Sequence, residues 1–160
     1  MEFQRINRTD PERIFLVVKN TYSTAALAAN QWAAFDTFTD KDGIGVTKPG
    51  ATRFTDLAMA GVIVEAIAVG DYGLCQCWGY RNSARVSGGS GLNTSKISEG
   101  TYLYIKTSGF AVHGLHTIAS TVTIKPWQLS RVGVSMGVAN TAAKATSATT
   151  WQGKVFIKCL

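Results

Sequence analysis

Two cysteines and two histidines are the residues whose types could hold a metal ion. Cys75 and Cys77 stand two positions apart, and His113 and His116 stand three apart. Zn²⁺ binds thiolate and imidazole ligands tetrahedrally, so these four would make a complete set. The spacing argues against such a site, because structural zinc sites usually leave roughly two to four residues between their cysteines and a regular strand would turn the two histidines to opposite faces. We expect no metal site, and we expect all three cysteines, including Cys159, to be reduced apolar residues.

The sequence offers little support for other kinds of catalytic site. The Gly-rich run 87–91 lacks the Lys-Ser/Thr ending of a phosphate-binding loop, and no serine stands in a strand–turn–helix elbow. Four aspartates lie in or beside predicted turns, where Asp is favoured because its side chain accepts backbone N–H bonds: Asp36, Asp40, Asp42 and Asp56. We therefore expect a protein that is not an enzyme and that needs no cofactor.

Glu65 stands out because it lies between Ile63 and Ile67 on a segment that we predict to be an apolar strand. A carboxylate in that position either pairs with Arg or Lys at an interface or is a site residue with a perturbed pKa. We favour the structural pairing.

Basic and aromatic residues that could bind single-stranded nucleic acid gather in the C-terminal part of the chain. They are Tyr80, Arg81, Arg85, Tyr102, Tyr104 and Lys106. The tyrosines at 102 and 104 alternate with Leu103 and Ile105, so they equally suit a strand that is offered to a neighbouring subunit, because Tyr is enriched in interface cores. We favour the subunit interface, with Glu65, Arg81, Arg85, Tyr102, Tyr104 and Lys106 as its candidates.

The elements that must position these residues are β-strands. Apolar and polar residues alternate with a period of two in several segments, as is typical of half-buried strands. The clearest are 102–106, 121–125 and 154–159. In 132–138 apolar residues alternate with Gly133, Ser135 and Gly137, which indicates close approach on the glycine side. Turn clusters separate the strands, so we predict an all-β fold: a single-domain β-sandwich or barrel of short antiparallel strands with an N-terminal arm.

The length of 160 residues is that of one domain. We take residues 1–13 as the N-terminal arm, with one helical turn predicted from Thr9 to Glu12, and residues 14–160 as the β domain. Within it, the Ala/Thr/Ser-rich segment 141–150 has no periodicity that would bury a face, so we predict a long loop there.

One internal similarity recurs along the chain. Ile67, Gly70 and Tyr72 are echoed thirty residues later by Ile97, Gly100 and Tyr102, and more faintly by Leu27, Asn30 and Trp32. Each copy predicts a tight turn with Gly or Asn in the left-handed conformation, followed by an aromatic residue that opens a strand. Chance reuse of hairpin chemistry in an all-β protein is an equal alternative.

Charge is sparse and unevenly placed. Charged residues make up 16% of the chain and hydrophobic ones 46%, which excludes a disordered chain. Residues 1–71 hold 7 basic and 9 acidic residues, whereas residues 72–160 hold 9 basic residues and one acidic one. The basic residues are spread singly, which fits docking on an acidic partner surface better than tracking a phosphate backbone. No signal peptide or membrane span is visible, so we expect synthesis in a cytosol.

Three segments carry a family resemblance. They are the Gly61-Val62-Ile63-Val64-Glu65 strand with its Gly70-Asp71 turn and Trp78-Gly79-Tyr80 strand end, the strand Gly100 to Ile105, and the strand Val132 to Ala139. Together they resemble the small head decoration, or cement, proteins of tailed bacteriophages, over roughly residues 16 to 139. Aliphatic residues would be expected in that family where Cys75 and Cys77 stand, and the tail beyond Asn140 has no counterpart.

The resemblance implies a non-enzymatic virion protein on the capsid surface that bridges adjacent major capsid subunits, commonly as a homotrimer, after assembly in the host cytoplasm. For such a protein, residues 1–13 are a candidate clasp on a neighbour, with Phe3 and Ile6 as apolar anchors and Arg5, Arg8 and Arg13 as carboxylate partners. A frayed terminus is the equal alternative. Two other functions stay open: a single-stranded nucleic-acid-binding β-barrel, and a head-surface or fibre module that stacks host carbohydrate on Trp32, Trp78, Trp127 or Trp151.

Overall fold

The computed structural model describes residues 12–40, 42–49, 58–87, 99–100, 102–105, 112–114, 131–136 and 150–159. In this part of the chain there are nine strands and no helix. The strands are β1 (Arg13–Asn20), β2 (Trp32–Phe35), β3 (Gly45–Thr47), β4 (Met59–Ile63), β5 (Tyr72–Ser87), β6 (Tyr102–Ile105), β7 (Val112–Gly114), β8 (Arg131–Ser135) and β9 (Thr150–Lys158). The predicted all-β fold is confirmed.

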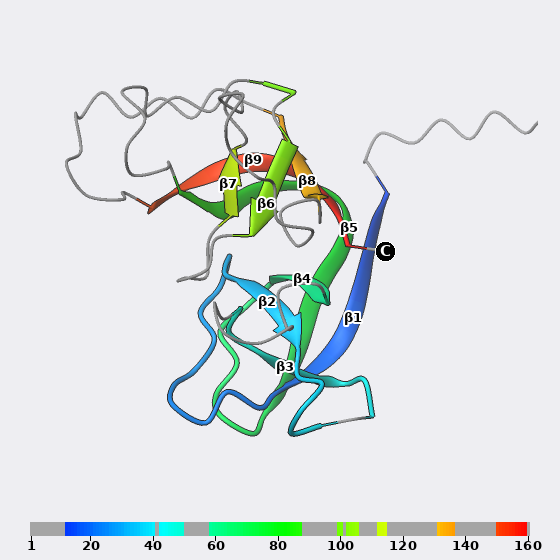
Figure 1. Cartoon of the computed structure of the whole chain (residues 1–160), viewed down its shortest axis with the longest axis vertical. Helices are drawn as coiled ribbons and strands as arrows, with labels where there is room; N and C mark the ends of the chain where they lie inside the picture. The colour runs from blue at the N-terminus through cyan, green and yellow to red at the C-terminus, as the bar shows by residue number, and fades with distance from the viewer. Residues whose placement is uncertain are drawn as a thin grey trace, which may run out of the picture.

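The strands close into two small rings that share β5. The hydrogen-bonded order is β1-β3-β2-β4-β5-β7-β6-β8-β9, and β5 also pairs with both β1 and β9. The pairing of β5 with β1 closes a first ring of β1 to β5, and its pairing with β9 closes a second ring of β5 to β9. Figure 1 shows the long β5 running from one ring into the other. Most pairings are antiparallel, as predicted, but β1–β3 and β5–β7 are parallel, and β5 spans 16 residues.

Both rings have the same strand order and share one irregularity of register. In the first ring Ala33 pairs with Gly61 of β4, and the register then shifts. In the second, Leu103 pairs with Gly133 of β8, and the register shifts at the same place. A Cβ at Gly61 would overlap the carbonyl oxygen of Gln76, and one at Gly133 would press on the carbonyl oxygen of Phe156. The close approach that the glycine pattern predicts at 133 is therefore confirmed, and its cause is the backbone of β9.

The recurring turn is also confirmed. Asn30, Gly70 and Gly100 have φ angles of 67°, 83° and 77°. Each lies two residues before the first residue of a strand, namely Trp32, Tyr72 and Tyr102. Gly adopts this left-handed conformation freely and Asn tolerates it better than most residues, which is why only these two types fill the three positions.

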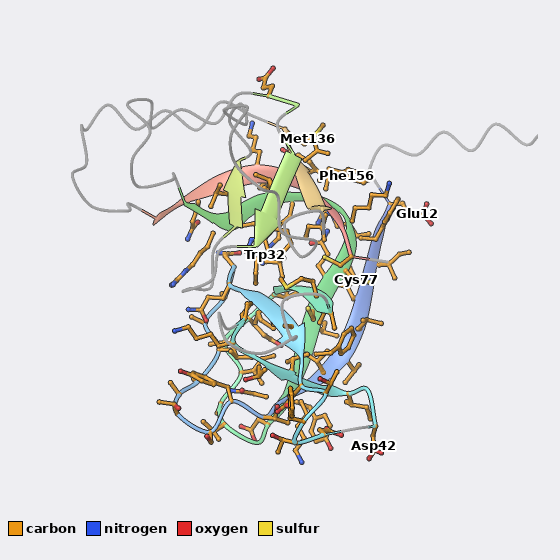
Figure 2. All side chains as sticks on the ribbon, in the orientation of Figure 1. Glu12, Trp32, Asp42, Cys77, Met136 and Phe156 are labelled. Atoms are coloured by element: carbon orange, nitrogen blue, oxygen red, sulfur yellow. The ribbon has the colours of Figure 1, made fainter. Side chains whose placement is uncertain are left out.

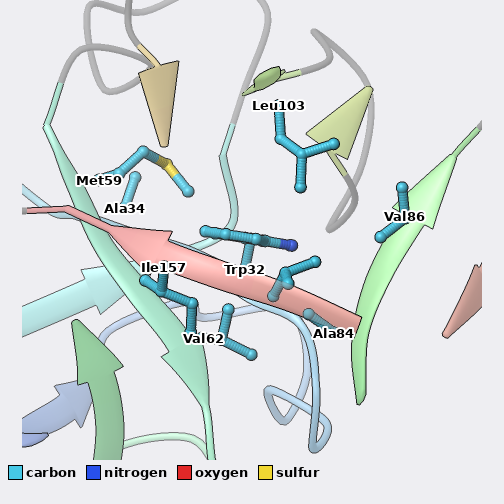
Figure 3. Close-up of a cluster of buried hydrophobic side chains, with 9 residues drawn as sticks. Trp32, Ala34, Met59, Val62, Ala84, Val86, Leu103 and Ile157 are labelled. Atoms are coloured by element: carbon cyan, nitrogen blue, oxygen red, sulfur yellow. The ribbon is translucent and has the colours of Figure 1, made fainter. Parts of the chain in front are cut away.

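Two apolar clusters form the core. The first fills the first ring and consists of Val18, Leu27, Ala33, Val46, Ala60, Ile63, Ile67 and Cys75. The second joins side chains from the other faces of β2 and β4 with side chains of the second ring: Trp32, Ala34, Met59, Val62, Ala84, Val86, Leu103, Val155 and Ile157. Figure 3 shows Trp32 in the middle of this second cluster. Strands β2 and β4 therefore bury both faces, one inside their own ring and one against the second ring.

Asp36 follows β2 and stabilises a turn by accepting backbone N–H bonds, which is the role that the sequence predicts for it. One carboxylate oxygen accepts the backbone N–H groups of Phe38 and Thr39 at 3.1 and 3.0 Å, and the other accepts the hydroxyl of Thr21 at 2.8 Å. Burial raises the pKa of Asp36, but these donors outweigh it, so its pKa lies below the ordinary value.

Candidate functional site: the β1–β5 face and the ring junction

The predicted interface residues are only partly in view. Phe3, Arg5, Ile6, Arg8 and Lys106 lie outside the described residues, as do the predicted helical turn at Thr9 to Pro11 and nearly all of the predicted loop at 141–150. Tyr102 and Tyr104 are described as backbone of β6, without their side chains. The proposed roles of these residues stay predictions.

Glu65 does not lie on a strand, which corrects the sequence expectation. Strand β4 ends at Ile63, and Glu65 stands in a bend of the β4–β5 connection with an exposed side chain. The backbone N–H of Val64 still donates to the carbonyl of Leu74, at 2.9 Å, which continues the pairing with β5 by one residue. The connection then leaves β5, and Ile67 pairs with Leu27 instead. An exposed carboxylate needs no buried partner, so the pairing argued from an apolar strand loses its physical reason.

Arg81 lies at the junction of the two rings, half-buried and bonded within the chain. Its guanidinium donates to the Asn30 side-chain oxygen at 2.7 Å and to the Gln76 side-chain oxygen at 3.3 Å. It also donates to the backbone carbonyls of Ser83, Ile63 and Val64 at 2.9, 3.1 and 3.4 Å. Arg81 sits where the register between β5 and β9 shifts, so these bonds hold a bulge of β5 against the β4–β5 connection of the first ring.

The acceptors around Arg81 are neutral. Burial lowers the pKa of Arg81, and the positive charge of Arg13 lowers it further. Since an arginine stays protonated in proteins in any case, the neutral oxygens act as hydrogen-bond acceptors for a half-buried cation. The sequence offered Arg81 as an interface residue; the structure places its donor groups inside the chain.

Arg85 and Asn30 complete the junction through their backbones. The N–H of Arg85 donates to the carbonyl of Asn30 at 2.8 Å, and the carbonyl of Arg85 accepts the indole N–H of Trp32 at 2.9 Å. Ser83 adds a hydroxyl bond to the Asn30 side chain at 3.1 Å. Asn30 therefore serves as the turn residue of the first ring and as the anchor for β5 of the second, a double role that no local sequence pattern signals.

A strip of exposed apolar side chains runs along the outside of the first ring on β1 and β5. We call the residues Phe15, Val17, Tyr72 and Leu74 the β1–β5 strip. Val17 pairs with Leu74, and Lys19 pairs with Tyr72, so these side chains share one face. Val17 is 64% exposed and Tyr72 63% exposed, and Phe15 and Leu74 are also exposed. The ammonium of Lys19 lies 5.8 Å from the centre of the Tyr72 ring.

The strip lies beside an aromatic pair from the second ring. Trp78 and Phe156 meet edge to face with ring centres 5.4 Å apart, and Ile14 of β1 is the register partner of Trp78. Cys75 and Cys77 are fully buried, whereas Tyr72 and Leu74 are exposed and Trp78 is half-buried. Strand β1 extends this apolar surface next to β5.

Cys75, Cys77 and Cys159 form no disulfide bond, and burial makes their thiols weak acids. Burial raises the pKa of Cys75 and of Cys77, and it raises the pKa of Cys159 to about 12. Among the described residues no group of three or more Cys, His, Asp and Glu is arranged to hold a metal ion. The side chains of the two histidines lie outside that set. The cysteines act as packing residues, as their sequence context predicts.

No protein-family model matches the chain, and a search of curated proteins found no relative. In the described part of the chain, no helix is long and apolar enough to cross a membrane. Figure 2 shows how side chains clothe both rings, with Trp32 between them and Asp42 at the far end of the first ring.

Proposed function

We propose that the chain is a head decoration protein of a tailed bacteriophage, which binds the finished shell and stabilises it by bridging adjacent major capsid subunits. The observation that carries the proposal is the exposed β1–β5 strip. Contiguous exposed apolar patches on soluble proteins usually mark interaction sites. The low charge content of the chain fits a protein whose surfaces become buried on assembly, and the exposed apolar strip is one such surface.

The N-terminal arm is the proposed contact with the shell. Residues 1–13 run directly into β1, whose first residue is the exposed Arg13. Phe3 and Ile6 are the proposed apolar anchors, and Arg5, Arg8 and Arg13 the proposed partners of carboxylates on the major capsid protein. Symmetric copies, for which the resemblance suggests a homotrimer, multiply weak contacts into avidity.

The binding experiment uses purified particles of the virus that encodes the chain, stripped of this protein by mild denaturation. The full chain is expected to sediment with the particles and to raise the temperature at which they release their genome. A variant lacking residues 2–8 is expected to lose most binding. A matched variant with Met136→Ser should bind normally, because the exposed Met136 directly follows β8 of the second ring and is not part of the proposed contact.

Two outcomes would overturn the proposal. The first is that the full chain fails to sediment with stripped particles. The second is tight binding of a labelled single-stranded oligonucleotide with a steep salt dependence, which would favour the nucleic-acid-binding function instead.

A further inference from the structure

Two of the three cysteines stand opposite each other where β9 meets β5. Trp78 pairs with Lys158 in this antiparallel pair of strands, so the next pair along is Cys77 and Cys159. The backbone N–H of Cys159 donates to the carbonyl of Cys77 at 3.0 Å, which continues the pairing one residue beyond the end of β9. Figure 1 marks the C-terminus close to β5, and Figure 2 labels Cys77 in the same region.

The separation and the facing of these two residues suit a disulfide bond. Opposite residues that are hydrogen-bonded across an antiparallel pair have Cα atoms about 5.5 Å apart, and disulfides usually span about 4.4–6.8 Å between Cα atoms. Directly opposite residues also share a face of the sheet. Cys77 is fully buried, and Cys159 packs against the core cluster around Trp32. The two thiols interact: after burial, the neighbouring Cys77 is the next cause that raises the pKa of Cys159.

We propose that Cys77 and Cys159 are the partners of an intramolecular disulfide bond, which forms when the protein enters oxidising surroundings. Both are thiols in the structure, and that of Cys77 donates to the carbonyl of Ile14 on β1 at 3.4 Å. The register shift between Ile14 and Phe15 leaves Cys77 without a register partner on β1. Forming the disulfide gives up this weak hydrogen bond, and a change of the Cys77 rotamer turns its sulfur from β1 toward β9.

Cys75 is a poor alternative partner for either thiol. It pairs with Leu16 of β1 and Ile63 of β4, not with β9. Cys75 is therefore a diagonal neighbour of Cys159, about 7–8 Å away between Cα atoms, which exceeds the roughly 7 Å that a disulfide spans without backbone movement. Cys75 and Cys77 are two residues apart on one strand, so a bond between them would be strained. The register thus selects one pair of the three.

Glutathione disulfide is an oxidant that balances the reaction. Cys159 is half-buried and follows the last strand, so its thiolate attacks first and releases one glutathione thiol, leaving a mixed disulfide. The thiolate of Cys77 then attacks the Cys159 sulfur, forms the Cys77–Cys159 bond and releases the second glutathione thiol. The two cysteines lose two electrons and two protons in total, and one glutathione disulfide becomes two thiols.

The bond would join the last strand covalently to the strand that both rings share. It would enclose residues 78–158, which include β6, β7 and β8 of the second ring. A disulfide that closes a long loop restricts the unfolded chain strongly and stabilises the fold. Cytosolic thiols stay reduced, whereas disulfides persist outside the cell. Only the timing rests on the proposed function, because a particle leaves the cytosol on release; the bond itself rests on the register of β5 and β9.

The experiment equilibrates the full chain with glutathione disulfide and measures its intact mass and its thiol count. We expect a loss of about 2 Da, the mass of two hydrogen atoms, and a fall from three thiols to one. Proteolytic mapping should locate the bond between Cys77 and Cys159. The midpoint of thermal unfolding should rise by roughly 5–10 °C. Oxidation is also carried out during refolding from urea, so that slow access to buried thiols cannot conceal the bond.

Two variants provide the matched comparison. Cys75→Ala should form the bond as the wild type does, whereas Cys159→Ser should keep both of its thiols. Thermal unfolding of the reduced variants confirms that each is folded.

Three results would overturn the inference. One is a chain that keeps all three thiols under both conditions. Another is a bond that includes Cys75 or that forms only between two chains. The third is an oxidised protein that is no more stable than the reduced one. None of these results bears on binding to the shell, which the sedimentation with stripped particles tests separately.

Discussion

The two rings share a strand order but not a way of filling their interiors. The first ring packs a core of its own, made by residues from β1 to β5 and their connections, with Leu27 and Ile67 bridged across it. The core of the second ring is completed from outside, because Trp32, Ala34, Met59 and Val62 all belong to the first ring. The second ring is therefore built onto a face of the first.

This difference explains how the outer surface of the first ring is divided. The face of β2 and β4 is covered by the second ring, whereas the face of β1 and β5 has no neighbour in the described chain and carries the exposed strip. The first ring thus has two apolar outer faces. One is covered by the second ring, and the other is exposed and available to another molecule. The substitutions below test the dependence of the second ring on the first.

The largest effect is expected from Trp32→Ala. It empties the centre of the shared cluster and removes the indole bond to Arg85, so we expect a loss of about 4 kcal/mol in the free energy of unfolding. Hydrogen exchange should show β9 losing protection more than β1. Ile67→Ala, in the core of the first ring, is the matched control and should weaken both strands together. Equal losses in β1 and β9 after Trp32→Ala would contradict the dependence.

A second comparison uses the equivalent glycines of β4 and β8. Gly61 has a φ of 141° and faces the Gln76 carbonyl, whereas Gly133 faces the Phe156 carbonyl without a positive φ. Gly61→Ala is expected to cost about 3 kcal/mol, from strain and overlap together, and Gly133→Ala about half as much. Denaturant unfolding measures both. Gly70→Asn, at an open turn where the equivalent Asn30 is native, should change stability little.

The junction gives the third prediction. Arg81→Met removes all the guanidinium bonds and leaves Gln76 and Asn30 short of donors, which is expected to cost about 2 kcal/mol. Arg81→Lys should recover only part of it, because an ammonium cannot reach the same acceptors at once. Thermal unfolding is the measurement. A Met variant as stable as the wild type would mean that the rings are held by the apolar cluster alone.

The smallest effect concerns the pH dependence of the first ring. Because the pKa of Asp36 is lowered in the folded state, its stabilisation is present above the unfolded pKa, near 4, and is lost as the pH falls through the folded value. Asp36→Asn is expected to cost about 1 kcal/mol at neutral pH and to flatten the decline in stability on acidification. Urea unfolding from pH 7 to pH 3 tests this, with exposed Asp42→Asn as the control.

Part of the fold could be predicted because the signals are local. The alternation around Val155 and Ile157 predicts a half-buried strand, and both residues are buried between exposed lysines. The turn at Gly70 could be predicted because a left-handed φ restricts the residue type. Glu65 was misplaced because apolar neighbours on both sides suggested a continuous strand, whereas the chain leaves β5 after Val64 and Ile67 pairs with Leu27, a residue far away in the sequence.

Local sequence is enough to predict that this chain is all-β and that left-handed turns fall at Asn30, Gly70 and Gly100. These follow from the two-residue period of strands and from backbone conformation, which are properties of neighbouring residues. Three features depend on the tertiary fold: β5 belongs to two rings, Arg81 is bonded to the first ring across their junction, and β1 places Phe15 and Val17 beside Leu74. Such pairings depend on contacts between distant segments, and no local pattern encodes them.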